Sequence, residues 1–319
     1  MGNGTIGVAA MGGNAKQVVT TVQDLERRGI EAVWLTAAAG GLDNLTMFSA
    51  AAPATERILL GSCIVTIWPR HPVIAATQVN AIAQLSDGRF RFGVGPGHAA
   101  GITKTYGANY RTPLTALREY IAIVRSLFQT GSVEFVGKVF AANYALPGPV
   151  RDTPIMASAL RPKSYELCGE VADGAISWVS PAVYLRDQAL PAIQRGANQA
   201  KRDAPPLVMH LPICVHEDGA EVLASVRDQL SNYPQSPFYQ AMFAQAGHPE
   251  AAETRTWSEG MRDSVVAWGA EDRVRSHIEE LFAWGVGEII AHIVTAGREP
   301  AASRERSLAL IERMSKARR

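Results

Sequence analysis

The sequence lacks the features that mark several large protein classes. Its 319 residues include only three cysteines, Cys63, Cys168 and Cys214, which lie far apart and form no CxxC pair. This set predicts neither a disulfide framework nor a cysteine-based zinc site. No apolar run reaches the roughly 18 residues of a membrane helix, and the opening MGNGTIGVAAM does not resemble a signal peptide. We therefore expect a cytoplasmic protein that does not contact a membrane.

An excess of charge of either sign is also missing. Thirty-one Lys and Arg against 30 Asp and Glu give a net charge of +1, which offers no electrostatic reason for binding nucleic acid. Neither a GxSxG elbow nor an HExxH pair occurs. Five further histidines show no metal-ligand spacing: His210, His216, His248, His277 and His292. Hydrolase and metalloenzyme functions are disfavoured, and we expect no metal.

What the chain does contain is a regular alternation of strand-like and helical segments. Such alternation predicts a parallel sheet with crossover helices, and eight units over this length favour an α/β fold of the (β/α)8 TIM-barrel type. The expected strands are residues 5–11, 32–36, 57–65, 89–94, 154–159, 175–179, 207–215 and 288–294. The expected helices are residues 14–28, 42–52, 73–85, 110–130, 162–171, 181–201, 272–284 and 303–316.

Two stretches interrupt this rhythm inside what we expect to be a single domain, residues 1–319. Residues 132–149 alternate in polarity and predict a hairpin insertion. Residues 220–269 predict a helical insertion. Its aromatic side chains either cover the barrel mouth or pack helices together: Tyr233, Phe238, Tyr239, Phe243 and Trp257.

The stretch 59–110 carries the candidate site, because it is a strand–helix–strand unit with a loop at the end of each strand. In such folds ligands bind at the carboxyl ends of the strands. The glycines of GVGPG, with Gly95, Pro96 and Gly97, allow close backbone approach to a ligand, although a plain tight turn explains them equally well. His98 follows directly and is a candidate for proton transfer. His71, between two prolines, fits a rigid corner at least as well.

A platform for a flat ring is the second candidate feature. Ile64 and Val65, beside Thr66 at the end of the third strand, could lie under a conjugated ring, and barrel core is the alternative. Because so few ionisable candidates are present, we expect a cofactor to carry the chemistry.

Several stretches of the sequence resemble a known group of enzymes. The runs IVTIWPRHPVIAATQVNAIAQLSDGRFRFGVGPGH, PIMASALRPKSYELCGEVADGAISW and VVAWGAEDRVRSHIEELFAWGVGEIIAHIV are similar to the bacterial-luciferase-like superfamily. The similarity is greatest to its coenzyme F420-dependent oxidoreductase branch, alongside methylenetetrahydromethanopterin reductase. The resemblance implies a TIM barrel with insertions, a small-molecule substrate and a homodimer.

The resemblance also implies a cofactor site. It places a non-proline cis peptide at Cys63–Ile64, behind a ring that Thr66 contacts, and the phosphate side of the cofactor on residues 168–172. The cofactor-binding residues expected in all are Cys63, Ile64, Val65, Thr66, Gly95, Pro96, Gly97, His98, Cys168, Gly169, Val171 and Ala172.

This chain departs from the sugar-phosphate and alcohol dehydrogenases of the branch. Ala37 and Ala38 stand where those enzymes carry an Asp-His pair, His98 replaces a glutamate, and Gln188 falls near their phosphate-binding lysine. We therefore expect an F420-dependent enzyme that moves a hydride to or from a small organic substrate, with C=C or C=N reduction favoured. His98 is the expected catalytic residue, as proton donor or as a polar contact to the ring. The alternatives are an FMN-dependent monooxygenase and a non-catalytic cofactor-binding protein.

Overall fold

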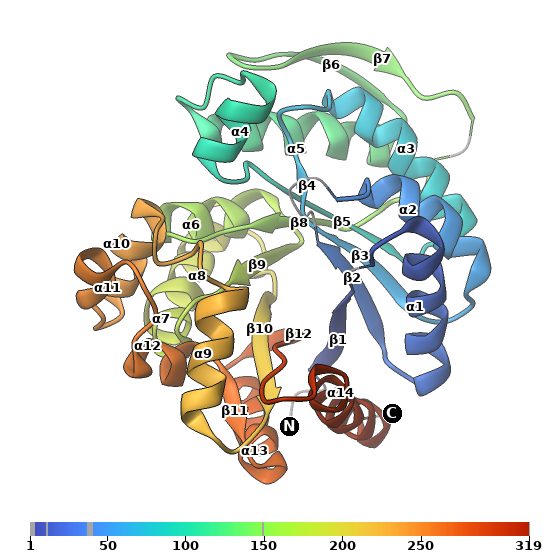
Figure 1. Cartoon of the computed structure of the whole chain (residues 1–319). Helices are drawn as coiled ribbons and strands as arrows, with labels where there is room; N and C mark the ends of the chain where they lie inside the picture. Colours follow the sequence, from blue (N-terminus) through green and yellow to red (C-terminus); the bar gives the residue numbers. More distant parts are fainter. Residues whose placement is uncertain (1–3, 11, 37–40, 149, 319) are drawn as a thin grey trace.

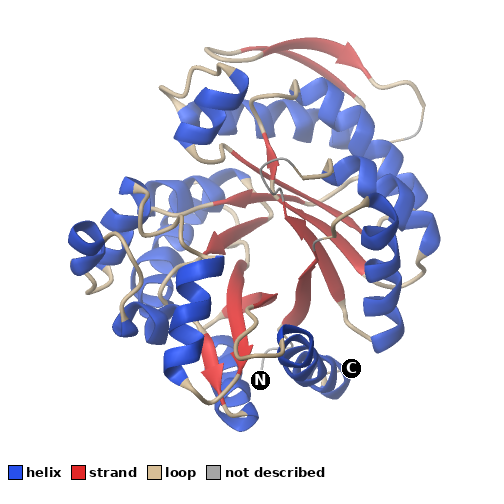
Figure 2. Cartoon of the chain, viewed as in Figure 1, coloured by secondary structure: helices blue, strands red, loops and turns tan. Residues whose placement is uncertain are grey.

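The computed structural model describes residues 4–10, 12–36, 41–148 and 150–318. Within these residues a parallel barrel of eight strands is surrounded by helices (Figures 1 and 2). The barrel strands are β1 (Thr5–Ala10), β2 (Ala32–Thr36), β3 (Leu59–Cys63), β5 (Phe90–Gly95), β8 (Ile155–Ser158), β9 (Gly174–Trp178), β10 (Leu207–Val215) and β12 (Val286–Ile293).

The pairing of the strands closes the sheet on itself. β1 lies between β2 and β12, with Gly7 opposite Ala32 and Ile290. At the opposite side β9 pairs with β10, so that no barrel strand is left as an open edge. The prediction of a (β/α)8 TIM barrel is confirmed.

The helices that follow the strands form the outer layer. They are α1 (Ala15–Arg28), α2 (Asn44–Ala51), α3 (Pro72–Leu85), α4 (Ala99–Tyr106), α5 (Pro113–Thr130), α6 (Pro162–Val171), α7 (Ala182–Tyr184), α8 (Leu190–Gln199), α9 (Gly219–Gln229), α10 (Pro237–Gln245), α11 (Glu250–Thr254), α12 (Glu259–Val265), α13 (Glu271–Ala283) and α14 (Pro300–Ala317). A 3-10 turn (Ala52–Ala54) extends α2, and a π-helical turn (Leu185–Ala189) joins α7 to α8. No helix in the described ranges is long and apolar enough to cross a membrane.

Local sequence signals set many of these boundaries. The Asn14 side chain accepts a hydrogen bond from the Gln17 N–H and begins α1. Gly29 ends the same helix with φ +83°, a left-handed conformation that favours glycine. His71 begins α3, because its ring accepts a hydrogen bond from the Val73 N–H, and the ring also contacts the Ala141 carbonyl at 3.2 Å. These contacts give His71 a structural role at a rigid corner.

The structure differs from the sequence expectations at three places. The third expected strand is divided into β3 and the short β4 (Val65–Thr66). Residues 99–106, which we left unassigned, form α4, and Gly107 ends this helix. The insertion at 220–269 is not helical throughout, since it ends in β11 (Ala267–Gly269), which pairs with β10 outside the barrel. A three-residue strand is too short to show a period of its own.

The expected hairpin is present as β6 (Ser132–Val136) and β7 (Ala141–Ala145), which pair antiparallel and lie outside α5 and α3 (Figure 1). A buried carboxylate fixes its tip. Glu119 of α5 accepts three backbone N–H bonds from residues 138–140, at 2.7 to 2.9 Å. These hydrogen bonds lower the pKa of Glu119 against the opposing effect of its burial.

Inside the barrel, near the amino ends of the strands, lies a polar group that we call the floor cluster: Trp34, Arg91 and Glu288. The Trp34 indole donates to Glu288 at 2.7 Å, Arg91 forms an ion pair with the same carboxylate, and the guanidinium lies 4.3 Å from the Trp34 ring centroid. Gly61 makes room for the indole, because a Cβ there would lie 2.4 Å from the Trp34 ring. Above this cluster the interior is apolar, with Ala9, Met156, Ile176, Val208 and Ile290.

Candidate active site

The two strand-end loops expected to form the site are brought together by one strand pairing. β4 pairs with the end of β5, with Val65 opposite Val94 and Thr66 opposite Gly95. The Ile67 N–H then donates to the Gly95 carbonyl at 3.1 Å. The Cys63–Ile64 peptide bond is cis, as the resemblance implied. The residues expected at 63–66 and 95–98 are therefore neighbours at the carboxyl ends of the strands.

Within this group the side chains face different ways. Cys63 and Ile64 are partly buried and pack against the apolar cluster inside the barrel. Val65, only 3% exposed, packs instead in the core between barrel and helices. Gly95 lies where the loops meet, because a Cβ there would be 2.0 Å from the Ser158 Oγ and 2.7 Å from the Ile64 Cδ1. The absence of a side chain at Gly95 lets these two groups approach.

The loop from Gly95 to His98 is held by aromatic side chains. The Trp68 indole donates to the Pro96 carbonyl at 2.8 Å, and the Tyr110 hydroxyl donates to the Gly97 carbonyl at 2.5 Å. Gly97 has φ +66°, where a side chain would be strained. The loop is thus a fixed part of the barrel mouth.

His98 stands at the start of α4 and meets the helical insertion. Its ring stacks on Tyr239 with centroids 5.7 Å apart and lies 6.2 Å from Tyr233. His98 as a whole residue is nevertheless exposed to solvent. Loss of water on the covered face lowers the pKa of His98 below its ordinary value. The imidazole is therefore mainly neutral at pH 7.

Of the aromatic residues in the insertion, some cover the barrel mouth and others pack helices together. Tyr233 and Tyr239 lie over the mouth, since Tyr233 contacts both His98 and Trp178. Phe243 and Trp257 pack helices together, with ring centroids 5.6 Å apart and the Trp257 indole donating to the Leu230 carbonyl. Phe238 is 56% exposed.

Three further residues at the mouth were missed by the sequence analysis: Trp178, His210 and His292. With Cys63 they form what we call the mouth cluster. The Trp178 ring lies 3.9 Å from His210 and 4.9 Å from His292, and the two imidazoles are 5.4 Å apart. The Cys63 Sγ is 3.6 Å from the His210 Nδ1. A signal was available, because a histidine within the wholly apolar run LVMHLPICV must face a buried environment.

The ionisable members of the mouth cluster are held neutral. Burial raises the pKa of the Cys63 thiol to about 12, with a smaller contribution from the negative charge of Glu288. Burial lowers the pKa of His210 well below its ordinary value, and the neighbouring His292 adds to this. Burial likewise lowers the pKa of His292 to about 4, with a smaller effect of Arg304. Removing charged forms from water explains each direction.

The structure does not bring the residues at 168–172 to this place. α6 runs from the mouth back toward the amino ends of the strands, so its last turn lies away from the strand ends. Cys168 is buried with its thiol toward the Ala157 carbonyl at 3.5 Å. A Cβ on Gly169 would lie 2.1 Å from the Ile193 carbonyl, so this glycine serves the close crossing of α6 and α8. Val171 accepts a hydrogen bond from Arg125, and the Ala172 N–H bonds to the Cys168 carbonyl. These residues are not part of the site proposed below.

Only some of the positions that distinguish this chain from sugar-phosphate dehydrogenases lie among the described residues. Ala37 and Ala38 lie outside the described residues. Gln188 is exposed on the π-helical turn between α7 and α8.

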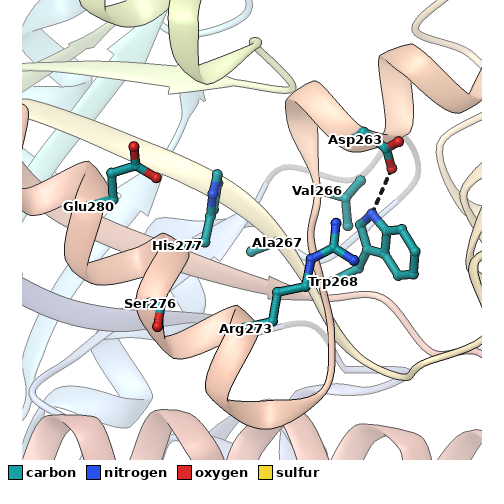
Figure 3. A pocket seen from close by; sticks show the side chains of 8 residues that line it. All are labelled: Asp263, Val266, Ala267, Trp268, Arg273, Ser276, His277 and Glu280. Atoms are coloured by element: carbon teal, nitrogen blue, oxygen red, sulfur yellow. Dashed lines mark hydrogen bonds between the residues drawn. The ribbon is translucent and has the colours of Figure 1, made fainter.

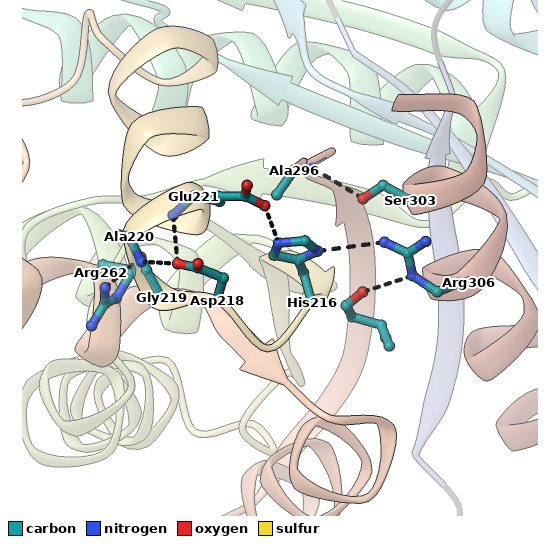
Figure 4. Close-up of polar contacts among 10 residues, drawn as sticks. His216, Asp218, Gly219, Ala220, Glu221, Arg262, Ala296, Ser303 and Arg306 are labelled. Atoms are coloured by element: carbon teal, nitrogen blue, oxygen red, sulfur yellow. Dashed lines mark hydrogen bonds and ion pairs between the residues drawn. The ribbon is translucent and has the colours of Figure 1, made fainter. Parts of the chain in front are cut away.

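Two other polar groups lie outside the site. A cavity of about 250 Å³ is lined by α12, β11 and α13, where Arg262 and Arg273 both lie 4.4 Å from the Trp268 ring and Asp263 accepts from its indole (Figure 3). After β10, His216 contacts Glu221 at 2.6 Å and Arg306 at 3.4 Å, which ties this loop to α9 and α14 (Figure 4). The described residues contain no cluster of three or more potential metal ligands.

The mouth fits a flat conjugated ring with a polar edge. Ile64 offers a partly buried apolar surface beside Gly95, and Thr66 lies at the same strand end. The Nε2 of His210 is buried and has no hydrogen-bond partner among the described residues. The apolar surface of Ile64 matches the face of such a ring, and the enclosed Nε2 lies in the layer beneath the strand ends.

Comparison with known proteins agrees with this fold. The profile of the family described as luciferase-like monooxygenase matches residues 3–288. The 5,10-methylenetetrahydromethanopterin reductase of Methanolobus tindarius is 27% identical over 285 residues, which are 83% of this chain and 86% of the reductase. An F420-dependent secondary alcohol dehydrogenase in complex with an F420-acetone adduct has a TM-score of 0.83 at 18% identity, over 100% of both chains. The FMN complex of the oxygenating constituent of 3,6-diketocamphane monooxygenase from Pseudomonas putida has a TM-score of 0.76 at 17% identity, covering 99% of this chain and 98% of that one.

Fold, site and relatives together define a barrel enzyme of the F420- or flavin-dependent oxidoreductase class. The chain belongs to the luciferase-like monooxygenase family, which confirms the resemblance seen in its sequence.

Proposed function

We propose that this protein is an F420-dependent oxidoreductase that transfers a hydride between the reduced deazaflavin and a small organic substrate, with reduction of a C=C or C=N bond favoured. The observation that carries the proposal is the pairing of β4 with β5, which gathers Ile64, Thr66 and the loop from Gly95 to His98 at one strand end. The similarity to the F420-dependent secondary alcohol dehydrogenase supports the choice of cofactor.

In this proposal the cofactor, when bound, supplies the hydride chemistry, and the protein positions the reactants. Ile64 and Thr66 hold one face and edge of the ring, and residues 95–97 border it. Tyr233 and Tyr239 exclude water from the mouth. His98 gives a proton to the anion that remains after a hydride has reached one end of the double bond. In the oxidation direction the same imidazole accepts that proton.

The first test is a titration of the protein with F420 and, separately, with FMN, followed by tryptophan fluorescence, to which Trp68 and Trp178 of the mouth contribute. Saturable binding of F420 with weak binding of FMN is expected. A preference for FMN would favour the FMN-dependent monooxygenase, for which the similarity to the camphane monooxygenase structure speaks. Binding of neither would contradict the cofactor proposal.

The role of His98 is tested by His98→Ala. Loss of a general acid lowers turnover by roughly 100-fold, while the affinity for F420 should change by less than about threefold. His277→Ala, on α13 outside the barrel, is the control and should leave turnover unchanged. Tight F420 binding without turnover on any enone or imine, in the unaltered protein, would favour the non-catalytic alternative.

The pH dependence gives a second test of His98. A proton donor must be protonated, so reduction should slow as pH rises through the lowered pKa of His98, below its ordinary 6.5. Oxidation should show the opposite trend. A reduction rate that is independent of pH in wild type, measured between pH 5 and pH 8, would remove His98 from proton transfer.

We also propose a homodimer, which sedimentation would test.

A further inference from the structure

The inward-facing side chains of the barrel change in character along its axis. Successive inward positions on a strand are two residues apart. On β9, β10 and β12 the apolar residues Ile176, Val208 and Ile290 are therefore followed by Trp178, His210 and His292. This layer lies near the ends of β9 and β12 and at the middle of β10, and it is polar although it is built on buried strands.

His210 is the most enclosed polar residue of this layer. It is 4% exposed, with its ring tilted against that of Trp178 and its Nδ1 beside the Cys63 thiol. A buried histidine of this kind is stabilised when each ring nitrogen has a partner, because an unpaired buried polar atom is unfavourable.

The contact with Cys63 decides which ring nitrogen carries the proton. The Cys63 thiol and the His210 ring are both held neutral by burial, so this is not a thiolate–imidazolium pair. A thiol is a weak acceptor, whereas an unprotonated imidazole nitrogen is a good one. The Cys63 S–H therefore donates to Nδ1, and the proton of the imidazole lies on Nε2.

This arrangement leaves a buried N–H donor without an acceptor. Nε2 makes no hydrogen bond to any described residue. Ser177, the neighbour of Trp178 in β9, lies on the opposite face of the sheet, away from the barrel interior. Its hydroxyl therefore cannot accept the hydrogen bond from His210. Nε2 is enclosed by the described side chains, so an acceptor that enters the barrel mouth reaches it only when some of these side chains move aside.

The geometry points to His210 as the residue that binds an uncharged carbonyl oxygen in the barrel mouth, by a hydrogen bond from Nε2, with Cys63 as the positioning residue. The carbonyl belongs either to the substrate or to the ring of the cofactor, and both offer the same acceptor. The inference rests on the proposed function only in placing the ligand at the mouth.

An uncharged ligand follows from the rest of the layer. Its inward residues carry no formal charge: Cys63, Gly95, Ser158, Trp178, His210 and His292. A carboxylate bound among these six residues would lose its water and would find no cationic side chain among them, which is unfavourable. A ketone or imide loses far less and gains the bond from His210.

The direct test uses protein labelled with ¹⁵N in its histidines and free of cofactor. Long-range ¹H–¹⁵N spectra report which nitrogen of each ring is protonated. The His210 signals are assigned by their absence from His210→Gln. We expect the Nε2–H form, and a saturable shift of its Nε2 resonance on addition of 2-cyclohexen-1-one. The matched carboxylate, 1-cyclohexene-1-carboxylate, should cause no shift at the same concentration.

Two substitutions at one position separate the two ring nitrogens. Gln places an amide nitrogen near the position of Nε2, whereas Asn reaches only that of Nδ1. Loss of the bond should weaken enone binding roughly tenfold in His210→Asn, the upper range for one hydrogen bond, with His210→Gln within about threefold of wild type. Cys63→Ala should give a mixture of tautomers, while Cys214→Ala should leave His210 unchanged.

Titration of the same variants with F420 identifies the source of the carbonyl. Weaker F420 binding in His210→Asn, with enone binding unchanged, assigns it to the cofactor, and the reverse assigns it to the substrate. The inference is overturned if Nδ1 carries the proton in wild type, or if neither ligand shifts Nε2. Failure of F420 and FMN to bind, with the enone shift intact, would contradict the proposed function alone.

Discussion

The floor cluster and the mouth cluster are both polar groups inside one barrel, yet their hydrogen bonding differs. In the floor cluster Glu288 is bound by both Trp34 and Arg91, so the charge of the carboxylate is balanced within the protein. In the mouth cluster the ring of His210 has a neighbour at Nδ1 and none among the described residues at Nε2. The Arg91 Nε also lacks a partner among the described residues, so the two clusters differ in the charge that the floor ion pair balances, and we propose that a ligand completes only the mouth cluster.

The strongest test of this contrast is removal of the floor charge. Glu288→Gln leaves the Arg91 guanidinium buried without a counter-ion, and we expect a loss of about 3–5 kcal/mol in the free energy of unfolding. Urea denaturation measures it. Glu217→Gln, on an exposed loop, should change stability by less than about 0.5 kcal/mol. A loss below about 1 kcal/mol for Glu288→Gln would show that the floor ion pair is not structural.

A smaller effect is expected from crowding the floor. Gly61→Ala introduces a Cβ 2.4 Å from the Trp34 ring, which is itself enclosed, and overpacking of this kind costs about 1–3 kcal/mol. Thermal unfolding gives the measurement. Gly101→Ala is the matched control, since nothing lies within 4 Å of its added Cβ and it sits in α4. There the substitution should be neutral or raise stability by up to about 1 kcal/mol.

The buried histidines of the mouth cluster should make the free energy of unfolding depend on pH. His292 has its pKa lowered to about 4 in the folded chain, so the unfolded chain binds the proton more readily. The contribution of the neutral ring to the free energy of unfolding is then fully present above about pH 6.5. It falls as pH decreases toward 4, by about 1–2 kcal/mol between pH 7 and pH 5. His292→Gln should flatten this part of the curve when urea unfolding is repeated at several pH values. An unchanged slope would mean that His292 is not buried as a neutral ring.

Much of the fold follows from local patterns in the chain. The alternation of apolar strands with amphipathic segments predicts the eight-stranded barrel, and Asn14 and Gly29 mark the ends of α1 as expected. The short β11 and the division of the third strand could not be predicted in this way, because both depend on pairing with strands distant in the sequence. α4 was missed because the glycines and small residues of its segment resemble a loop.

The candidate site likewise contains residues that could be predicted from the sequence and residues that could not. Residues 64–66 lie at the end of one predicted strand and residues 95–98 follow another, and parallel strands end at one edge, so both could be named from the sequence. Cys63 was named only through the family resemblance. His210 and His292 were set aside because they are 82 residues apart along the chain and lack a ligand spacing. Only the closed barrel brings them beside Trp178, with ring centroids within 5 Å of that indole.

By itself, then, the sequence determined the barrel, its two insertions and the strand ends at which to look, since these depend on periodicity and turn residues within short windows. The tertiary structure decided which side chains meet inside. It showed Val65 packed away from the mouth, residues 168–172 at the far end of α6, and the Cys63–His210 contact at the barrel mouth. The physical reason is that inward or outward facing depends on strand register and barrel closure, which are properties of pairs of strands and not of any one segment.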